Sequence, residues 1–355
     1  MSKTSNLQLD GNKMLHHLDR VQEWQLGEDI FPIYIAFSPS SLCNHKCNFC
    51  VYHYKEFEPI YFPKLQYLSL VDEWKEHRVK SIFFAGDGEP LLNKDSVEMI
   101  EYTRASGIDI AMNTNGRLIS KSNVKSLVTN LSWIRISLNA GSEDSYGDIH
   151  GTSKKDFEVV MNNLQLLVDT KEELKSSITI GVQCVLLDQN KNEIELLAKR
   201  LKEIGVSYLS IKPFLKHPGT KFNDVIQDRD KVLARLQKLE SLNDDDFMFI
   251  LRMTNFSNTF KRDYKQCLSG EFMLEIDARG DVYSCGPFIG DKRHCYGNVL
   301  ADSFETMWNS ERKKKVLSYI QNELNVCKCM PFCRPDSVNK FLWELKKPPE
   351  HVNFI

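Results

Sequence analysis

The feature that most constrains this chain is a short loop with three cysteines, Cys43, Cys47 and Cys50, spaced Cys-x3-Cys-x2-Cys. Such a loop can bring three sulfur atoms onto one site, and thiolates suit zinc or iron–sulfur clusters. A closed structural zinc site needs four ligands. The loop therefore predicts a metal site with one open coordination position. His45 and His53 could fill that position, which keeps zinc as the alternative.

Composition excludes several classes of protein. The chain has 355 residues and is 42% hydrophobic, enough for one large domain or two smaller ones. A net charge of -2 provides no basic field for nucleic acid. The first 30 residues lack a signal-peptide apolar core, and no apolar run approaches the roughly 18 residues of a membrane helix. We therefore expect a cytoplasmic protein that binds neither nucleic acid nor membrane.

The ten cysteines fall into two groups. In a cytoplasmic protein they indicate metal or redox ligands rather than disulfides. Three lie in the first loop and six lie between Cys267 and Cys333. Cys184 stands alone in an apolar run and is expected to be a small core residue. The distribution predicts two metal sites.

Apolar runs and helix-period stretches alternate from about residue 33 to residue 214. Such alternation predicts right-handed βαβ units and a parallel sheet, with functional loops at the carboxyl ends of the strands. The three-cysteine loop follows the first run, at that end. The predicted strands are Ile33–Phe37, Ser81–Ala85, Ile108–Asn113, Trp133–Leu138, Ile178–Leu186 and Tyr208–Lys212.

The two ends of the chain are predicted to differ from this middle part. An amphipathic helix over Lys13–Gln25 is expected to pack as a cap on the main domain. Residues 215–265 are less regular, and a β-hairpin is expected after Cys267. The lysines at 313–315 are expected on a solvated helix face. The remaining predicted elements are a helix at Asp228–Leu242, hairpin strands at Phe272–Ile276 and Val282–Ser284, and helices at Ser303–Ile320 and Val338–Leu345.

The first loop, with Phe49 just before the third cysteine, resembles the cluster-binding loop of the radical S-adenosylmethionine (SAM) superfamily. The resemblance implies that the three cysteines hold a [4Fe–4S] cluster whose remaining iron binds SAM. After the second strand, Gly88 and Glu89 are similar to the family segment that binds the amino group of SAM, although Asp87 interrupts the usual pair of glycines. Glycine lets a ligand approach the backbone closely, and Glu89 supplies an acceptor for an ammonium.

Further positions at the ends of strands match the family by their order in the chain. Each polar residue among them has an alternative role in capping a helix or forming a turn. Lys212, at the end of the sixth strand, is a candidate for contact with substrate or a cofactor carboxylate. The resemblance implies SAM-binding roles for Phe49, Gly88, Glu89, Asn115, Ser137, Asn139, Gln183 and Val185.

The C-terminal cysteines also carry a resemblance. Cys267 and Cys285 bracket the predicted hairpin, with Gly280 five positions before Cys285. This resembles the signature of SPASM and Twitch extensions, which hold auxiliary iron–sulfur clusters. Six cysteines are too few for two fully ligated clusters, so one auxiliary [4Fe–4S] cluster is expected, with structural zinc as the alternative. Two further ligands are to come from Cys327, Cys329 and Cys333.

The resemblance predicts an α/β fold. It consists of a partial (β/α)6 TIM-like barrel and a small C-terminal α+β cluster-binding domain of Twitch/SPASM type. The expected divisions are an N-terminal helical cap at 1–30, the radical SAM barrel at 31–225, a linker and helix at 226–265, and the auxiliary cluster domain at 266–355.

The activity implied is reductive cleavage of SAM to a 5′-deoxyadenosyl radical that abstracts a substrate hydrogen atom. Electrons would come from a donor such as flavodoxin or ferredoxin. The expected outcome is oxidation or epimerisation of a carbohydrate-like or aminocyclitol-like small molecule, because about 30 residues before the first strand leave no room for a peptide-recognition domain. In the epimerase branch Cys295 would return the hydrogen atom; otherwise it is a spare ligand or an inert thiol.

Two alternatives stay open. The first is a radical SAM maturase of a ribosomal peptide, acting as an epimerase or cross-linker. The second belongs to another class and is a non-enzymatic zinc or redox-sensing protein that uses the same thiols.

Overall fold

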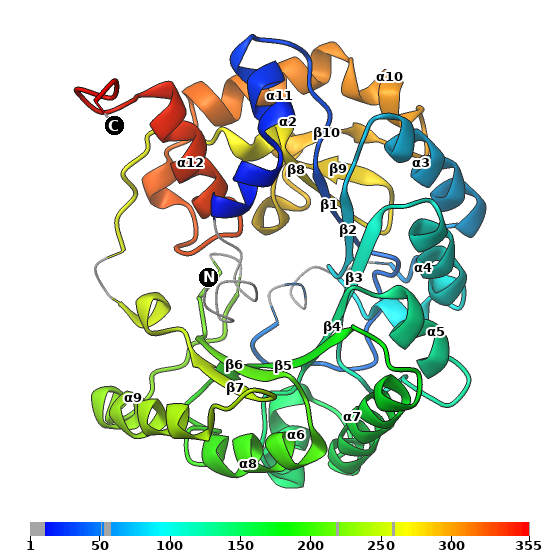
Figure 1. The fold of residues 1–355 in the computed structure, drawn as a ribbon, viewed down its shortest axis with the longest axis vertical. Coiled ribbons are helices and arrows are strands. Elements are labelled where there is room, and N and C mark those ends of the chain that lie inside the picture. The colour runs from blue at the N-terminus through cyan, green and yellow to red at the C-terminus, as the bar shows by residue number, and fades with distance from the viewer. Residues whose placement is uncertain (1–10, 51, 53–57, 218–219, 258–259, 355) are drawn as a thin grey trace.

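One curved sheet organises the molecule in the computed structural model, which describes residues 11–50, 52, 58–217, 220–257 and 260–354 (Figure 1). Within these residues the sheet has ten strands in the order β10-β9-β8-β1-β2-β3-β4-β5-β6-β7. Strands β1 to β6 lie within one residue of the predicted bounds, and they pair in parallel. The strands are β1 (Tyr34–Phe37), β2 (Ser81–Phe84), β3 (Asp109–Thr114), β4 (Trp133–Ser137), β5 (Thr179–Leu186), β6 (Tyr208–Pro213), β7 (Met248–Leu251), β8 (Met273–Ile276), β9 (Asp281–Tyr283) and β10 (Cys295–Asn298).

Helices α3 to α9 lie around the outside of the curved sheet, as the partial barrel predicts (Figure 1). No helix in the described part of the chain is both long and apolar enough to cross a membrane. The α-helices are α2 (Leu18–Gln25), α3 (Lys64–Glu76), α4 (Ser96–Ala105), α5 (Val124–Asn130), α6 (Glu143–His150), α7 (Asp156–Glu173), α8 (Ile194–Ile204), α9 (Arg229–Gln237), α10 (Phe304–Trp308), α11 (Glu311–Asn322) and α12 (Asp336–Lys346).

The two faces of the sheet have different chemistry, because successive strand residues point to opposite sides. Outward residues such as Ile82, Ile110 and Ile134 belong to one buried cluster with the helices. Inward residues such as Arg135 and Lys212 line a cavity instead. Unlike a barrel filled by branched side chains, this one therefore keeps an open, polar interior.

The structure adds two strands that the sequence did not assign to the barrel. β7 lies in the stretch predicted to be irregular and pairs in parallel with β6. β8 forms the predicted hairpin with β9, but it also pairs in parallel with β1. The six-stranded barrel is thus extended at both edges, and the C-terminal strands continue its sheet. The division of the chain into domains at 31–225 and 266–355 stays a prediction.

The N-terminal cap differs from its prediction. The expected helix over Lys13–Gln25 is a 3-10 helix, η1 (Gly11–His16), followed by α2. Its buried residues Met14 and Val21 pack in one cluster with Leu342 of α12. The cap therefore packs on C-terminal elements, while Arg20 and Glu23 of α2 also bind His77 and Arg78 at the end of the barrel helix α3.

The prediction of one helix over Ser303–Ile320 was wrong. The helix is broken into α10 and α11, and the Ser310 hydroxyl caps α11 by accepting from the backbone N–H of Lys313 at 3.3 Å. Lys313, expected in solvent, is buried. Its ammonium lies 3.2 Å from Asp29 and 4.7 Å from the centre of the Trp308 ring. Periodicity within one helix could not show this, because Asp29 lies 284 residues away.

Candidate active site

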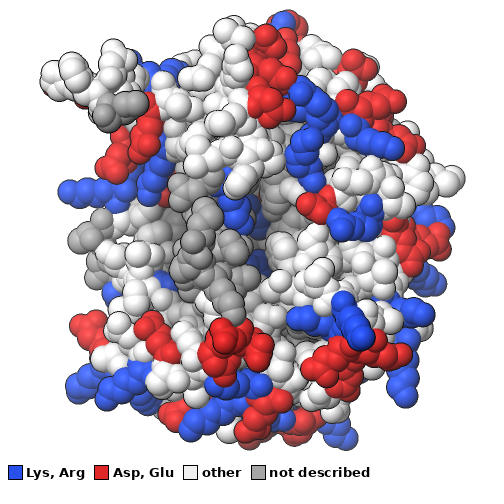
Figure 2. Space-filling view, viewed as in Figure 1, with Lys and Arg blue, Asp and Glu red and all other residues white. Residues whose placement is uncertain are grey.

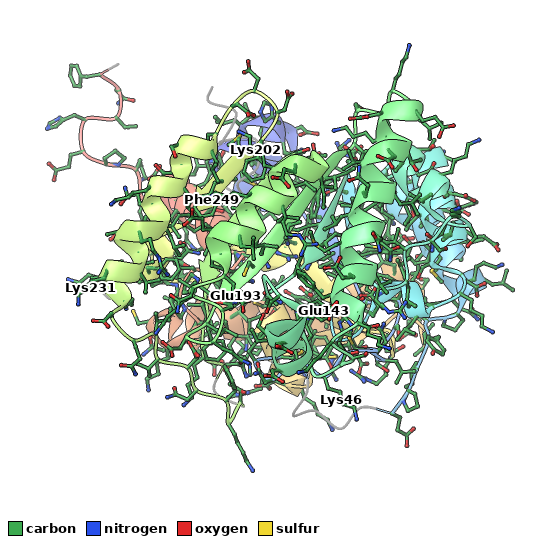
Figure 3. All side chains as sticks on the ribbon, turned by 90° about the horizontal axis from the view of Figure 1, so that it is seen from below. Lys46, Glu143, Glu193, Lys202, Lys231 and Phe249 are labelled. Atoms are coloured by element: carbon green, nitrogen blue, oxygen red, sulfur yellow. The ribbon has the colours of Figure 1, made fainter. Side chains whose placement is uncertain are left out.

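The three-cysteine loop lies at the carboxyl ends of the strands. Figure 3 shows Lys46 of this loop at the same end of the barrel as Glu143 and Glu193, which follow β4 and β5. Lys202, near the end of α8, lies toward the opposite end (Figure 3). The end that carries the three-cysteine loop is the one at which parallel α/β barrels place their functional loops.

A cavity of about 410 Å³ opens beside the loop. All three cysteines line it, and so does Lys212. The sequence therefore predicted which residues meet there, although their individual roles stay predictions. The cavity lining also contains every residue proposed for SAM: Phe49, Gly88, Glu89, Asn115, Ser137, Asn139, Gln183 and Val185.

Gly88 is required by the packing of the cysteine loop. A Cβ atom on Gly88 would lie 2.3 Å from the carbonyl oxygen of Leu42 and 2.4 Å from that of Ser40. The backbone N–H of Glu89 donates to the same Leu42 oxygen at 2.7 Å. The glycine thus lets the β2 loop approach the cysteine loop, whereas the sequence suggested a close approach to ligand.

Glu89 is buried and joins the ends of two strands. One carboxylate oxygen accepts from the Thr114 hydroxyl at 2.6 Å, and the other accepts from the backbone N–H of Asn115 at 2.7 Å. Burial raises the pKa of Glu89, while these hydrogen bonds oppose that shift. The carboxylate is therefore held in one orientation at the cavity wall, as a positioned acceptor must be.

His150, at the end of α6, is a residue of this site that sequence reasoning missed. Its Nε2 accepts from the backbone N–H of Asn139 at 3.0 Å, and its Nδ1 lies 3.5 Å from Cys47 Sγ. Burial lowers the pKa of His150 to about 3, so the ring is neutral with its proton on Nδ1. The proton on Nδ1 is therefore donated to the Cys47 sulfur.

The last turn of α6 also holds the cysteine loop through its backbone. The carbonyl of His150 accepts from the N–H of Lys46 at 2.9 Å. Gly151 follows in the left-handed region, at φ 58°, and a Cβ there would lie 2.3 Å from the Lys46 carbonyl oxygen. A histidine before a helix-ending glycine is visible in the sequence, but its contact with the distant loop is not.

A second set of thiols meets at the C-terminal strands. Cys267, Cys285, Cys329 and Cys333 line one small cavity, and burial together with repulsion from Cys333 and Cys267 raises the pKa of Cys285. Cys327 is exposed and lines a different groove. Cys329 and Cys333 face Cys267 and Cys285 in this cavity. The choice of the two further ligands of the auxiliary cluster therefore falls on them rather than on Cys327.

Two buried side chains hold this second set in place. The Arg262 guanidinium donates to the carbonyls of Cys329 at 3.3 Å and Met330 at 2.5 Å. Asn339 Nδ2 lies 3.5 Å from Cys267 Sγ, and its Oδ1 accepts two backbone N–H groups just after that cysteine. Both segments that carry the thiols are thus fixed by hydrogen bonds.

The other predicted residues fall elsewhere. Cys295 is buried on β10 against Tyr283 and Ile289, and it lines neither thiol cavity. Its role as a hydrogen-atom donor stays a prediction. The His45 ring lies edge-on to Tyr146, and burial lowers its pKa to about 4. His53 lies outside the described residues.

The two donor sets suit iron–sulfur clusters. Soft thiolates are the normal ligands of such clusters, and the sequence supplies three at one cavity and four at the other. Within residues 11–50, 52, 58–217, 220–257 and 260–354, no three His, Cys, Asp or Glu side chains lie close enough to share a single metal ion. The fold and the thiol sets define a barrel protein with two cysteine-ligated cluster sites.

Comparison with known families agrees with that class. The radical SAM superfamily matches residues 37–201, and the SPASM iron-sulfur cluster-binding domain matches residues 267–334. The chain belongs to the radical SAM superfamily and carries a SPASM-type C-terminal domain. Its cofactors are SAM, a SAM-binding [4Fe–4S] cluster and an auxiliary iron–sulfur cluster.

Individual relatives are distant. The chain is 23% identical over 300 residues to mycofactocin maturase MftC of Mycobacterium tuberculosis, covering 82% of this chain and 73% of MftC. Streptococcus suis SuiB bound to S-adenosylmethionine has a similar fold, with a TM-score of 0.65 at 16% identity over 84% of this chain and 71% of SuiB. Native anSMEcpe with bound AdoMet gives a TM-score of 0.61 at 20% identity over 89% of this chain and 95% of anSMEcpe.

Proposed function

We propose that this radical SAM enzyme modifies a peptide, with the reacting residue of the peptide bound in the barrel cavity between the two cluster sites. That cavity has a volume of about 490 Å³. Gln183 and Lys212 line both it and the first thiol cavity, while Cys285 and Cys333 line both it and the second. This shared lining is the observation that carries the proposal, because a substrate there would face both cofactors.

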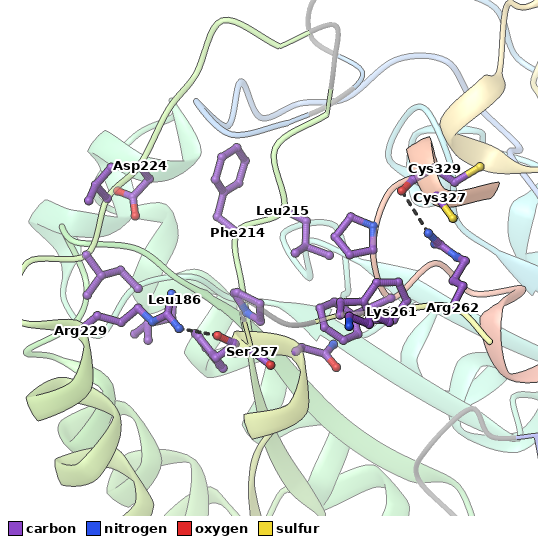
Figure 4. A pocket seen from close by; sticks show the side chains of 18 residues that line it. Leu186, Phe214, Leu215, Asp224, Arg229, Ser257, Lys261, Arg262, Cys327 and Cys329 are labelled. Atoms are coloured by element: carbon purple, nitrogen blue, oxygen red, sulfur yellow. Dashed lines mark hydrogen bonds between the residues drawn. The ribbon is translucent and has the colours of Figure 1, made fainter. Parts of the chain in front are cut away.

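A groove of about 860 Å³ supplies room for a chain that leads into this cavity. Figure 4 shows Phe214 and Leu215, which follow β6, on one side and Cys327 and Cys329 on the other. Leu215 and Asn255 line both the groove and the barrel cavity. A peptide could thus lie along the groove and place one residue inside, with no separate recognition domain.

The relatives favour a peptide over the carbohydrate-like small molecule expected from the sequence. MftC is named a maturase. SuiB has been solved bound to the precursor peptide SuiA, and anSMEcpe with AdoMet and the Cp18Cys peptide. The sequence argument against a peptide rested on the lack of a recognition domain, and the groove offers another means of binding.

When bound, the reduced cluster and SAM supply the radical that abstracts a hydrogen atom from the substrate. Cys43, Cys47 and Cys50 would hold that cluster, and the cavity beside them would orient SAM. The four thiols at Cys267, Cys285, Cys329 and Cys333 would hold the auxiliary cluster against the same substrate cavity. A redox centre at the substrate favours oxidation or cross-linking, and the position of Cys295 outside the thiol cavities gives the epimerase branch no support.

The test compares two substrate pools from deuterated cells of the source organism. One is a peptide fraction and the other a carbohydrate and small-molecule fraction. Each is incubated with reconstituted enzyme, SAM and dithionite, and deuterium in 5′-deoxyadenosine is measured by mass spectrometry. Deuterium transfer from the peptide fraction supports the proposal, and transfer from the small-molecule fraction alone contradicts it. The Cys43→Ala variant is the control, because it should lose the SAM-binding cluster and all transfer.

A further inference from the structure

Basic side chains gather in the barrel cavity with little opposing charge. Figure 2 shows acidic and basic side chains interspersed over the outer surface and basic side chains inside the central hollow. Arg135 comes from β4, Lys212 from β6, and Arg252 directly follows β7. The charged residues that line the cavity are Lys13, Arg135, Lys212, Arg252, Arg334 and Glu275.

Three of these cations have no carboxylate partner among the residues that the structure describes. Arg135 Nε donates to the Asn113 side-chain oxygen at 2.7 Å, and Arg252 Nε donates to the Ser210 hydroxyl at 3.0 Å. Lys212 forms no hydrogen bond with any residue that the structure describes. None of the three forms a salt bridge within 4.0 Å to a described residue. Their guanidinium and ammonium groups therefore keep donors available for a ligand.

Arg334 is different from these three. It donates to the Tyr34 hydroxyl and lies over the Phe83 ring, 4.8 Å from its centre. Glu275 on β8 opposes its charge. Arg334 also follows Cys333 directly, so it belongs more to the auxiliary site than to the centre of the cavity.

Arg135, Lys212 and Arg252 also repel one another. Burial lowers the pKa of Lys212 to about 7, and the charges of Arg135, Arg252 and Arg334 add to that shift. Burial likewise lowers the pKa of Arg135, which the charge of Arg252 lowers further. Holding like charges in a half-buried cavity is costly unless an opposite charge binds there. A bound anion would remove that cost.

We propose that the substrate carries an oxyanion, a carboxylate or a phosphate, which Arg135, Lys212 and Arg252 bind inside the barrel. Planar guanidinium groups match the two oxygens of a carboxylate, and an ammonium adds a point charge. The anion would hold the reacting residue beside the first thiol cavity, since Lys212 lines both spaces.

The rest of the wall suits an apolar or aromatic group next to the anion. Trp133, Tyr208 and Phe83 line the same cavity, and the Arg135 guanidinium lies 5.3 Å from the centre of the Trp133 ring. For a peptide substrate, the anion is the terminal carboxylate or an acidic side chain. That the bound anion is part of the substrate rests on the proposed function, whereas the anion site itself rests on the three cations.

The experiment measures binding by isothermal titration calorimetry to reconstituted enzyme with SAM. The probes are acetyl-Gly-Phe with a free carboxylate, acetyl-Gly-Phe-amide, acetyl-Asp-Phe-amide and phenyl phosphate. We expect at least one anionic probe to bind about tenfold or more tightly than the neutral amide, the size of one hydrogen bond to a charged group. The tightest of the three then identifies a terminal carboxylate, an acidic side chain or a phosphate as the source.

Variants connect that binding to the named residues. Arg135→Gln and Arg252→Gln should each weaken the best anionic probe about tenfold and leave the neutral amide unchanged. Arg104→Gln is the matched control, because Arg104 pairs with Asp109 on the outer surface. If one variant fails to fold, the other carries the test, together with the loss of anion affinity at high salt in the wild type. Equal binding of acid and amide, or wild-type affinity in both variants, would overturn the proposal.

Failure of this inference can be told apart from failure of the proposed function. Binding of anions requires no SAM cleavage, so it can be measured in the Cys43→Ala variant as well. Anion binding without deuterium transfer from peptides would contradict the proposed function alone. Transfer from peptides with no preference for anions would contradict only the oxyanion site.

Discussion

At the scale of single residues, the hydrogen bond from His150 to Cys47 should tune the first cluster. Hydrogen bonds to ligating sulfur stabilise the more negative, reduced state and so raise the reduction potential. We expect His150→Phe, which keeps a ring against Tyr146, to lower the potential on the order of 40 mV, the equivalent of about 1 kcal/mol. A redox titration followed by electron paramagnetic resonance measures the shift.

The control for that experiment is His77→Phe, which changes a histidine that stacks on Phe31 just before β2. It should leave the potential unchanged. An unaltered potential in His150→Phe, with its iron content retained, would show that the contact does not act on the cluster.

Lys212 should give anion binding a pH dependence. Its pKa of about 7 means that the ammonium is charged below pH 7 and loses its proton above it when no anion is bound. Arg135, Arg252 and Arg334 stay charged over this range, whereas the Cys184 thiol stays protonated and neutral, because burial raises its pKa far above this range. The affinity for the best anionic probe should therefore fall as pH rises above about 7, by at most about tenfold per pH unit. Calorimetry at several pH values tests this, and Lys212→Met should bind more weakly and without that slope.

At the scale of elements, the loop that carries Cys329 and Cys333 depends on Arg262. Arg262→Lys keeps the charge, but its single ammonium nitrogen cannot replace the two terminal guanidinium nitrogens that donate to the carbonyls of Val326, Cys329 and Met330. We expect the auxiliary cluster to be lost from the variant, with iron falling from roughly eight to roughly four per chain. Iron and sulfide analysis measures this, with Arg104→Lys as the control. A variant that keeps the full iron content would mean that the thiols alone fix the loop.

Helices and strands could be predicted where the apolar pattern of neighbouring residues marks them. The six predicted strands are apolar runs separated by helix-period stretches, and their bounds follow from the sequence within one residue. β7 is four residues long and entirely apolar, so it has no alternation to recognise. The roles of Cys327 and Cys329 could not be separated either. They are two residues apart and line the same groove, and of the two only Cys329 also lines the cavity of Cys267 and Cys285.

At the scale of the whole molecule, the features that the sequence did not predict are those built from residues far apart in the chain. The motifs placed the three cysteines of the first loop and the SAM-binding candidates at one end of a barrel, and the structure brings all of these residues to one cavity. The cationic interior is not a motif. It arises because Arg135 on β4, Lys212 on β6 and Arg252 just after β7 come from strands that lie near one another in the curved sheet, so that their side chains meet in one cavity. The ion pair between the buried Lys313 and Asp29 likewise joins residues that are far apart in the sequence.

The pairing of β8 with β1 predicts that the barrel and the cluster-binding strands lose structure together. Leu274 of β8 is buried in the same apolar cluster as Ile35 of β1 and Ile82 of β2. Leu274→Ala should lower the free energy of unfolding by about 2–5 kcal/mol. Hydrogen exchange in mild urea, read by mass spectrometry, should then show faster exchange in β1 and β2 as well as in β8. Leu233→Ala, on α9 near the other edge of the sheet, is the matched control and should accelerate exchange first around β6 and β7. If Leu274→Ala accelerated exchange only from residue 266 onward, the C-terminal strands would form an independent unit, as the domain division drawn from the sequence implies.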